Sequence, residues 1–257
     1  MALVAGGGVE AYAWLRFMEF PYLGPGLLVK WGRPPSLYNV IEPAVVREVR
    51  VRTPRGAFRG ALVVSEEAHS LHGVALPVPV RRLGPGLYRV GLAIELGVYT
   101  RARLRGYGGV VEACVYGGKA EAEALGMVPL ESSMVRGYAT AHLVLGYGEK
   151  TLVAAPEPLG FPLEVVPVTI SNLYEPGEAV EVQVLRGGEP LPGARLEVSY
   201  VDGSRSEAKA SEDGVAVVKT GPMVTVVSVT VVEDAPEGSD YDKVKTTATL
   251  SIQAVTL

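Results

Sequence analysis

The sequence predicts an all-β protein made of two β-sandwich domains, and three observations lead to that prediction. Apolar side chains alternate along the last hundred residues, as valines over residues 180–184 and as Leu, Val and Tyr over residues 196–200. Gly, Pro and Asp-Gly turns separate these runs, and the net charge changes sign along the chain. Alternation with a period of two is what a sheet with one buried and one exposed face requires.

The change of charge and a proline-rich segment place the boundary between the domains. Residues 1–160 carry 17 Lys and Arg against 13 Asp and Glu, and residues 161–257 carry 7 against 15. The halves are therefore +4 and −8, which agrees with −4 for the whole chain. The segment Ala-Pro-Glu-Pro begins at Ala155 and is typical of linkers. We expect one domain over residues 1–155 and another over residues 161–257.

Turns and alternating runs mark the strands of the first half. Leu-Gly-Pro-Gly-Leu occurs at residues 23–27 and again at 83–87, and each copy predicts a tight turn in front of a strand. A further pair of strands is expected at residues 45–52 and 60–65, joined by Thr-Pro-Arg-Gly. The first half therefore reads as a series of strands connected by short turns.

A strand expected at residues 99–107 has a basic face. Arg101, Arg103 and Arg105 share one side of it, because side chains two residues apart on a strand point the same way. The acidic second half has the opposite charge, in the same molecule or in a neighbouring copy. We expect the three arginines to dock on it.

Only one segment favours a helix. Residues 118–126 are rich in Ala, Glu and Lys and end in Gly126, which predicts a short connecting helix. Less than about a tenth of the chain is therefore expected to be helical, against about a third in ordinary domains. The strands expected in the second half are residues 180–185, 195–200, 215–219, 224–232 and 246–253.

The composition indicates a thermophilic protein without disulfides. Cys114 is the single cysteine and is expected to be a small buried apolar residue. The amide side chains, which are thermolabile, number only four. His142 flanks an apolar strand and is expected to be a structural histidine with its hydrogen bonds satisfied. No apolar run reaches the ~18 to 20 residues that a membrane-spanning helix needs.

Several segments together resemble one protein family. The most extensive is Gly-Phe-Pro-Leu-Glu-Val-Val-Pro at residues 160–167. Similar matches lie at residues 11–15, 136–141, 188–194, 240–241 and 247–250. The sequence resembles the two-domain family of unknown function whose members are described as the periplasmic component of cobalt and nickel uptake systems. The resemblance covers nearly the whole chain, although the matching motifs are turns and strand starts.

The resemblance implies a fold and a setting. It implies that the second domain is like transthyretin or an immunoglobulin domain. It also implies a protein working outside the membrane beside transporter components, with an export signal that is not present in this chain. Family members commonly carry a histidine before the aromatic opening segment, and Glu10 and Ala11 stand there instead. This chain therefore lacks that metal ligand.

One segment could bind a transition metal. Glu66, His69 and His72 are spaced three apart, so a helical turn would bring a carboxylate and two imidazoles to one side. Nickel, cobalt and zinc accept such ligands. The alternative is a solvated loop, because three ligands from one short segment make an incomplete coordination shell.

A second segment could bind calcium. Asp234, Asp240 and Asp242 lie in an acidic loop that also contains Pro and Gly, and carboxylate oxygens are the ligands that calcium prefers. The loop does not match the twelve-residue pattern of helix-loop-helix calcium sites. The alternative is an ordinary exposed acidic loop.

Two classes of function remain open at this point. The sequence contains no nucleophile elbow, phosphate loop, dinucleotide fingerprint or zinc-protease helix, so an enzyme is not expected. The acidic chain, with a pI near 5.6, is a poor match for nucleic acid. The first class is a non-catalytic accessory protein of metal uptake. The second is a structural or adhesive protein of the cell surface that assembles with its own copies.

Overall fold

The structure is a computed structural model, and nearly every element in it is a strand. Among the described residues the only helix is α2 (Lys119–Ala124), which confirms the helix expected at 118–126. No described helix is long and apolar enough to cross a membrane. The described residues are 12–20, 24–32, 46–54, 56–59, 75–79, 86–104, 112–145, 150, 152–153, 156–200 and 202–254.

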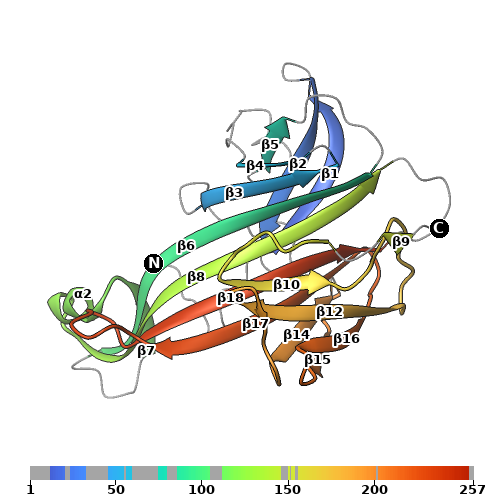
Figure 1. Cartoon of the computed structure of the whole chain (residues 1–257). Helices are drawn as coiled ribbons and strands as arrows, with labels where there is room; N and C mark the ends of the chain where they lie inside the picture. The colour runs from blue at the N-terminus through green and yellow to red at the C-terminus, as the bar shows by residue number, and fades with distance from the viewer. Residues whose placement is uncertain are drawn as a thin grey trace.

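One nine-stranded sheet runs through the molecule (Figure 1). Its two longest strands, β6 (Gly86–Leu104) and β8 (Met127–Leu145), pair antiparallel along their whole lengths. All its other neighbours are antiparallel too, except that β18 pairs with β8 in parallel. The remaining strands are β3 (Val46–Thr53), β4 (Gly56–Arg59), β7 (Glu112–Tyr116), β14 (Arg195–Tyr200), β15 (Arg205–Lys209), β17 (Val224–Asp234) and β18 (Lys243–Gln253).

This sheet crosses the expected domain boundary. β8 precedes the proline-rich segment and β18 follows it, yet the two pair from Ser133 with Lys243 to Ala141 with Ser251. Strands from both halves therefore share one set of ladder hydrogen bonds. The all-β class is confirmed, whereas the division into two separate domains is not.

A second sheet closes a sandwich over one end of the first. Its strands are β10 (Leu163–Pro167), β12 (Ala179–Arg186), β13 (Glu189–Pro190) and β16 (Val215–Lys219). The alternating residues of β12 and β16 point into the core, as the period of two predicts. A two-residue pair, β9 (Leu152–Val153) with β11 (Ile170–Ser171), lies beside it. The buried core includes Val180, Val182, Val184, Leu196, Val198, Val227, Val229, Leu250 and Ile252.

The N-terminal strands form a third, smaller sheet. It consists of β1 (Tyr12–Phe20), β2 (Gly24–Gly32) and β5 (Ala75–Pro79), and it lies behind β6 and β8 in Figure 1. The turn predicted at the first Gly-Pro-Gly is wrong, because these residues belong to β2. At the second copy Gly86 opens β6 with φ +135°, and a Cβ there would lie 2.3 Å from Pro54 Cγ.

The hairpin of β3 and β4 differs from its prediction in the second strand. The turn after Thr53 is where the sequence places it, but β3 pairs with residues that follow at once, from Thr53 with Gly56 to Arg50 with Arg59. The expected second strand, residues 60–65, lies outside the described residues. The shorter loop is favoured because Pro54 sets the backbone of a tight turn.

The ends of β6 and β8 extend beyond the sandwich and form what we call the distal end. It comprises α2, β7, residues 98–104 of β6, residues 127–133 of β8 and the loop 235–242 between β17 and β18 (Figure 1). Ala102 and Met127 of the strands pack against Ala122 of α2 in a small core of their own. The sandwich and the distal end are therefore stabilised by separate apolar clusters.

Candidate functional site

The candidate site starts from three basic residues that lie side by side on neighbouring strands. Arg52 of β3 is directly opposite Arg89 of β6, and Arg89 is directly opposite His142 of β8. Directly paired residues share a face of the sheet, so the three side chains form a row. Arg89 is only 1% exposed and His142 only 5%. A buried guanidinium is uncommon and requires compensation.

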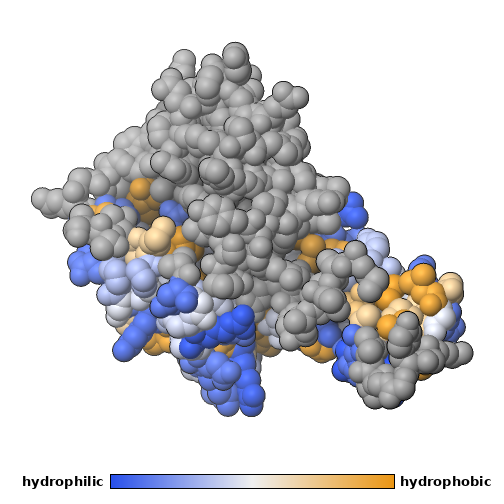
Figure 2. Space-filling view, turned by 180° about the vertical axis from the view of Figure 1, so that it is seen from behind, coloured by the Kyte–Doolittle hydropathy of each residue, from blue (hydrophilic) through white to orange (hydrophobic). Residues whose placement is uncertain are grey.

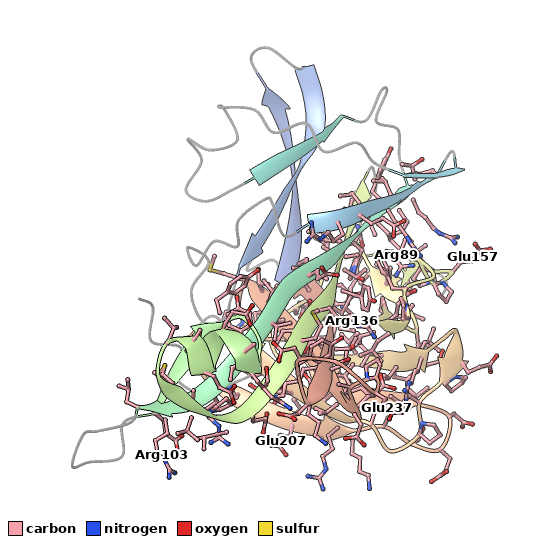
Figure 3. All side chains as sticks on the ribbon, turned by 90° about the vertical axis from the view of Figure 1, so that its left-hand side faces the viewer. Arg89, Arg103, Arg136, Glu157, Glu207 and Glu237 are labelled. Atoms are coloured by element: carbon pink, nitrogen blue, oxygen red, sulfur yellow. The ribbon has the colours of Figure 1, made fainter. Side chains whose placement is uncertain are left out.

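Residues 156–161, which we call the clasp, supply part of that compensation. The Arg52 guanidinium forms an ion pair with the Glu157 carboxylate, and Arg89 Nη1 donates to the Glu157 carbonyl. Figure 3 shows Arg89 and Glu157 together at one end of the sheet, away from Arg103 at the distal end. The segment expected to be a linker is thus fastened to the sheet.

Aromatic packing holds the clasp at its other end. The Phe161 ring stacks on Tyr138 with centroids 5.1 Å apart, and the Arg50 guanidinium lies 4.4 Å from the Phe161 centroid. Arg50 Nη1 also donates to the Leu159 carbonyl at 2.9 Å. Gly91 of β6 makes room for this contact, since a Cβ there would lie 2.4 Å from the Phe161 ring.

Glu164, the first buried acid after the clasp, holds the clasp in position. Its carboxylate is 2% exposed and accepts the backbone amides of Leu159 at 2.8 Å and Phe161 at 2.6 Å. Burial lowers the pKa of Arg89 to about 10, and the charge of Glu164 acts against that shift. Glu164 is therefore both the acceptor for two clasp amides and the nearby counter-charge for Arg89.

His142 is held neutral by its surroundings. Burial lowers its pKa to about 3, and the adjacent positive charge of Arg89 acts in the same direction. The imidazole meets the Tyr174 ring edge to face, with centroids 6.1 Å apart. Tyr174 Oη accepts the Ser171 amide at 3.0 Å, and burial raises the pKa of this phenol to about 12. The pair is fixed in place and uncharged at neutral pH.

Within the described part of the chain, three nitrogen atoms of this row have no hydrogen-bond partner. They are Nε and Nη2 of Arg89 and Nδ1 of His142, all fully enclosed. The expectation that His142 is structural agrees with its burial, but its hydrogen bonds are not satisfied. Unpaired buried donors are rare in folded proteins, so these three atoms mark the row as unusual.

The predicted metal ligands are not part of this row. Glu66, His69 and His72 lie outside the described residues, so the transition-metal prediction stays a prediction. Within the described parts of the chain, no group of three His, Cys, Asp or Glu side chains is placed to hold a metal ion.

The three predicted calcium ligands are instead engaged with protein groups at the distal end. Asp234 pairs with Lys243 at 2.5 Å, and Asp240 accepts the Ala120 amide of α2 at 3.4 Å. Asp242 pairs with Lys119 at 2.5 Å and accepts the Ser132 amide at 3.0 Å. The hydrogen bond from Lys119 is the largest cause that lowers the pKa of Asp242. These contacts tie loop 235–242 to α2 and β8.

The arginine face is paired differently from the sequence prediction. Arg101 and Arg103 lie 3.4 and 3.8 Å from the carboxylate of Glu112 on the adjacent strand β7. The prediction that they dock on the acidic second half of the same molecule is therefore wrong, and Arg105 lies outside the described residues. Cys114, expected to be buried, is half-exposed on the same strand.

Sequence reasoning overlooked Arg89 and Glu164. The signal for Glu164 was present, as an acid in the otherwise apolar strand of residues 163–167. Arg89 carried no such signal, because an arginine in an alternating run reads as an exposed position. Its burial depends on the clasp, which lies 67 or more residues further along the chain.

A family model matches most of the chain. A family model described as "Domain of unknown function (DUF4198)" matches residues 31–222. The match includes the row, the clasp and Glu164. A search of curated proteins found none that matches.

Proposed function

Because this chain belongs to the DUF4198 family of domains of unknown function, we propose that it is a non-catalytic accessory protein of cobalt or nickel uptake that works outside the cytoplasmic membrane. The proposal takes its setting from the resemblance carried by the segments around residues 160–167 and 188–194. Its partners would be membrane components of the transporter.

The observation that carries the non-catalytic part is the burial of the side chains with the largest pKa shifts, Arg89 and His142 among them. A catalytic acid or base must come within hydrogen-bond reach of its substrate. Arg89, His142 and Glu164 are all buried. The exposed or half-exposed acids Asp234, Asp240 and Asp242 are paired with lysines or a backbone amide. This distribution supports a protein that acts by binding.

Metal binding, if it occurs, should depend on Glu66, His69 and His72. We expect nickel or cobalt to bind the wild type and to bind a His69→Ala, His72→Ala double variant at least about tenfold more weakly. Imidazole must be neutral to coordinate, so the affinity should fall as the pH drops through ~6.5. Isothermal titration calorimetry on protein purified without an affinity tag measures both effects.

The matched control is His142→Gln, which removes the third histidine but leaves the predicted ligands intact. Equal affinity in the wild type and the double variant would exclude these residues as ligands. Absence of binding in all three proteins would contradict the metal-uptake proposal itself.

A second candidate function is self-assembly at the cell surface, and exposed apolar side chains at the distal end favour it. Tyr116 is 70% exposed and Leu125 65%, and Val128 and Leu130 of β8 are also exposed. Figure 2, seen from behind, shows apolar surface at this end of the molecule. Arg101 and Arg103 lie there too, whereas residues 161–257 carry a net charge of −8. A second copy of the chain offers the complementary charge.

Sedimentation velocity over a range of concentrations tests this assembly. We expect the wild type to associate and a Tyr116→Ser, Leu125→Ser double variant to remain monomeric, because exposed aromatic and aliphatic side chains anchor most interfaces. Val217→Ser, which removes an exposed valine of β16 in the sandwich, is the control and should associate like the wild type. Monomeric behaviour of all three proteins would contradict self-assembly.

A further inference from the structure

We propose that Arg89 and His142 form a buried binding site for a small inorganic anion such as chloride or nitrate. The proposal begins with the three enclosed nitrogen atoms that lack hydrogen-bond partners, Arg89 Nε, Arg89 Nη2 and His142 Nδ1. The two residues are direct cross-strand partners on β6 and β8, so these atoms belong to one short stretch of the same sheet face.

The two nitrogens of Arg89 without partners lie where the guanidinium can bind an anion with two parallel hydrogen bonds. Nε and Nη2 lie on one edge of the planar guanidinium, and their N–H groups point in parallel. This edge is the one that binds two oxygens of an oxyanion, or a single halide between its N–H groups. Nη1, on the other edge, already donates to the Glu157 carbonyl. One edge of the guanidinium is therefore bound to the clasp, and the other edge is left for an anion.

The acids near Arg89 are engaged elsewhere. The carboxylate of Glu164 accepts the amides of Leu159 and Phe161, and the carboxylate of Glu157 pairs with Arg52. Among the described residues, therefore, neither of these acids fills the Nε and Nη2 edge of Arg89. A buried guanidinium that leaves two of its donors unpaired is costly in general, and relief of that cost is the driving force for an anion to bind here.

The enclosure of the row limits the size of the ligand. Arg89 is 1% exposed and His142 5%; the clasp contacts Arg89 through the Glu157 carbonyl, and its Phe161 packs beside Gly91, two residues further along β6. A phosphate ester or a peptide carboxylate would bring attached groups that the closed clasp does not admit. Neutral His142 supplies a third donor in the tautomer that carries its proton on Nδ1, and that tautomer favours an anion over a cation.

Thermal unfolding in different sodium salts at equal ionic strength tests the site. The reference salt has the large organic anion HEPES, which cannot enter an enclosed site. We expect chloride or nitrate at about 100 times its dissociation constant to raise the Tm of the wild type by about 5 °C over the reference. Arg89→Lys keeps the charge but loses the paired N–H edge, so this rise should disappear.

Arg136→Lys is the matched control. Arg136 lies on the same strand as His142, and its Nε donates to Thr246 Oγ1 at 3.0 Å, away from the row. General salt effects act on all the variants alike, so only the difference between Arg89→Lys and Arg136→Lys reports the site. An equal rise of Tm in both variants would overturn the proposal.

A second measurement covers the case in which Arg89→Lys does not fold. Chloride NMR of the wild type should show excess line broadening that nitrate removes by competition, and His142→Phe should reduce it at least severalfold. No excess broadening in the wild type, or broadening unchanged by His142→Phe, would mean that water and not an anion satisfies these atoms.

Discussion

Glu164→Gln is expected to lower the free energy of unfolding by about 3 kcal/mol, although the two side chains have nearly the same size. The wild-type carboxylate accepts two clasp amides, from Leu159 and Phe161. A glutamine has one oxygen and one NH₂ group, so it would direct N–H against one of those amides. The variant would also leave the buried Arg89 without its nearby negative charge.

Urea unfolding followed by circular dichroism measures this loss as a lower midpoint with an unchanged m-value. The matched control is Glu181→Gln on β12, an exposed position in the neighbouring strand of the same sheet. We expect the control to change stability by no more than about 0.5 kcal/mol. A loss in Glu164→Gln as small as that of the control would show that the clasp is not anchored by this carboxylate.

His142 should make the protein lose stability on mild acidification. Its pKa is about 3 in the folded protein because of burial and the charge of Arg89, and ~6.5 in the unfolded chain. The folded state resists protonation of such a group, whereas the unfolded chain takes up the proton readily. The contribution to stability is therefore complete above the pKa of the unfolded chain and is lost as the pH falls toward the pKa of the folded protein. We expect about 3 kcal/mol to disappear between pH ~7 and pH ~4.5.

His142→Gln isolates this contribution from that of the carboxylates. The variant cannot take up the proton, so its stability should fall less steeply over the same range, while the carboxylates act equally in both proteins. The comparison requires urea unfolding at several pH values in a buffer whose anion is large, so that Arg89 binds none. Parallel pH profiles for the two proteins would contradict the buried, neutral state of His142.

Local patterns in the sequence predicted five strands of the second half closely and missed β10, β11, β13 and β15. The strands expected at 195–200 and 215–219 match β14 and β16 residue for residue, because alternation and the flanking turns are properties of a few consecutive residues. The helix at Lys119–Ala124 was predictable for the same reason. The turn expected at residues 24–26 failed because strand pairing with β1 and β5 overrode the local preference of Gly and Pro.

The candidate site was far less predictable, since it depends on residues distant in the chain. Arg89 and Glu157 are 68 residues apart, and nothing in the run around Arg89 shows that a clasp will cover it. The sequence also does not reveal that Asp240 and Asp242 have α2 and Lys119 as partners. Composition identifies a charge but not the group that compensates it.

By itself, the sequence determined that this protein is all-β, where most strands of its second half lie, and that the one short helix among the described residues follows residue 118. Only the tertiary structure decided that β8 and β18 join both halves in one sheet, that the clasp binds Arg89, and that Arg89 and His142 are buried. The physical reason is the range of the interactions. Side-chain period and turn chemistry are local, whereas the choice of a strand's partner and the burial of a charge depend on the whole folded chain.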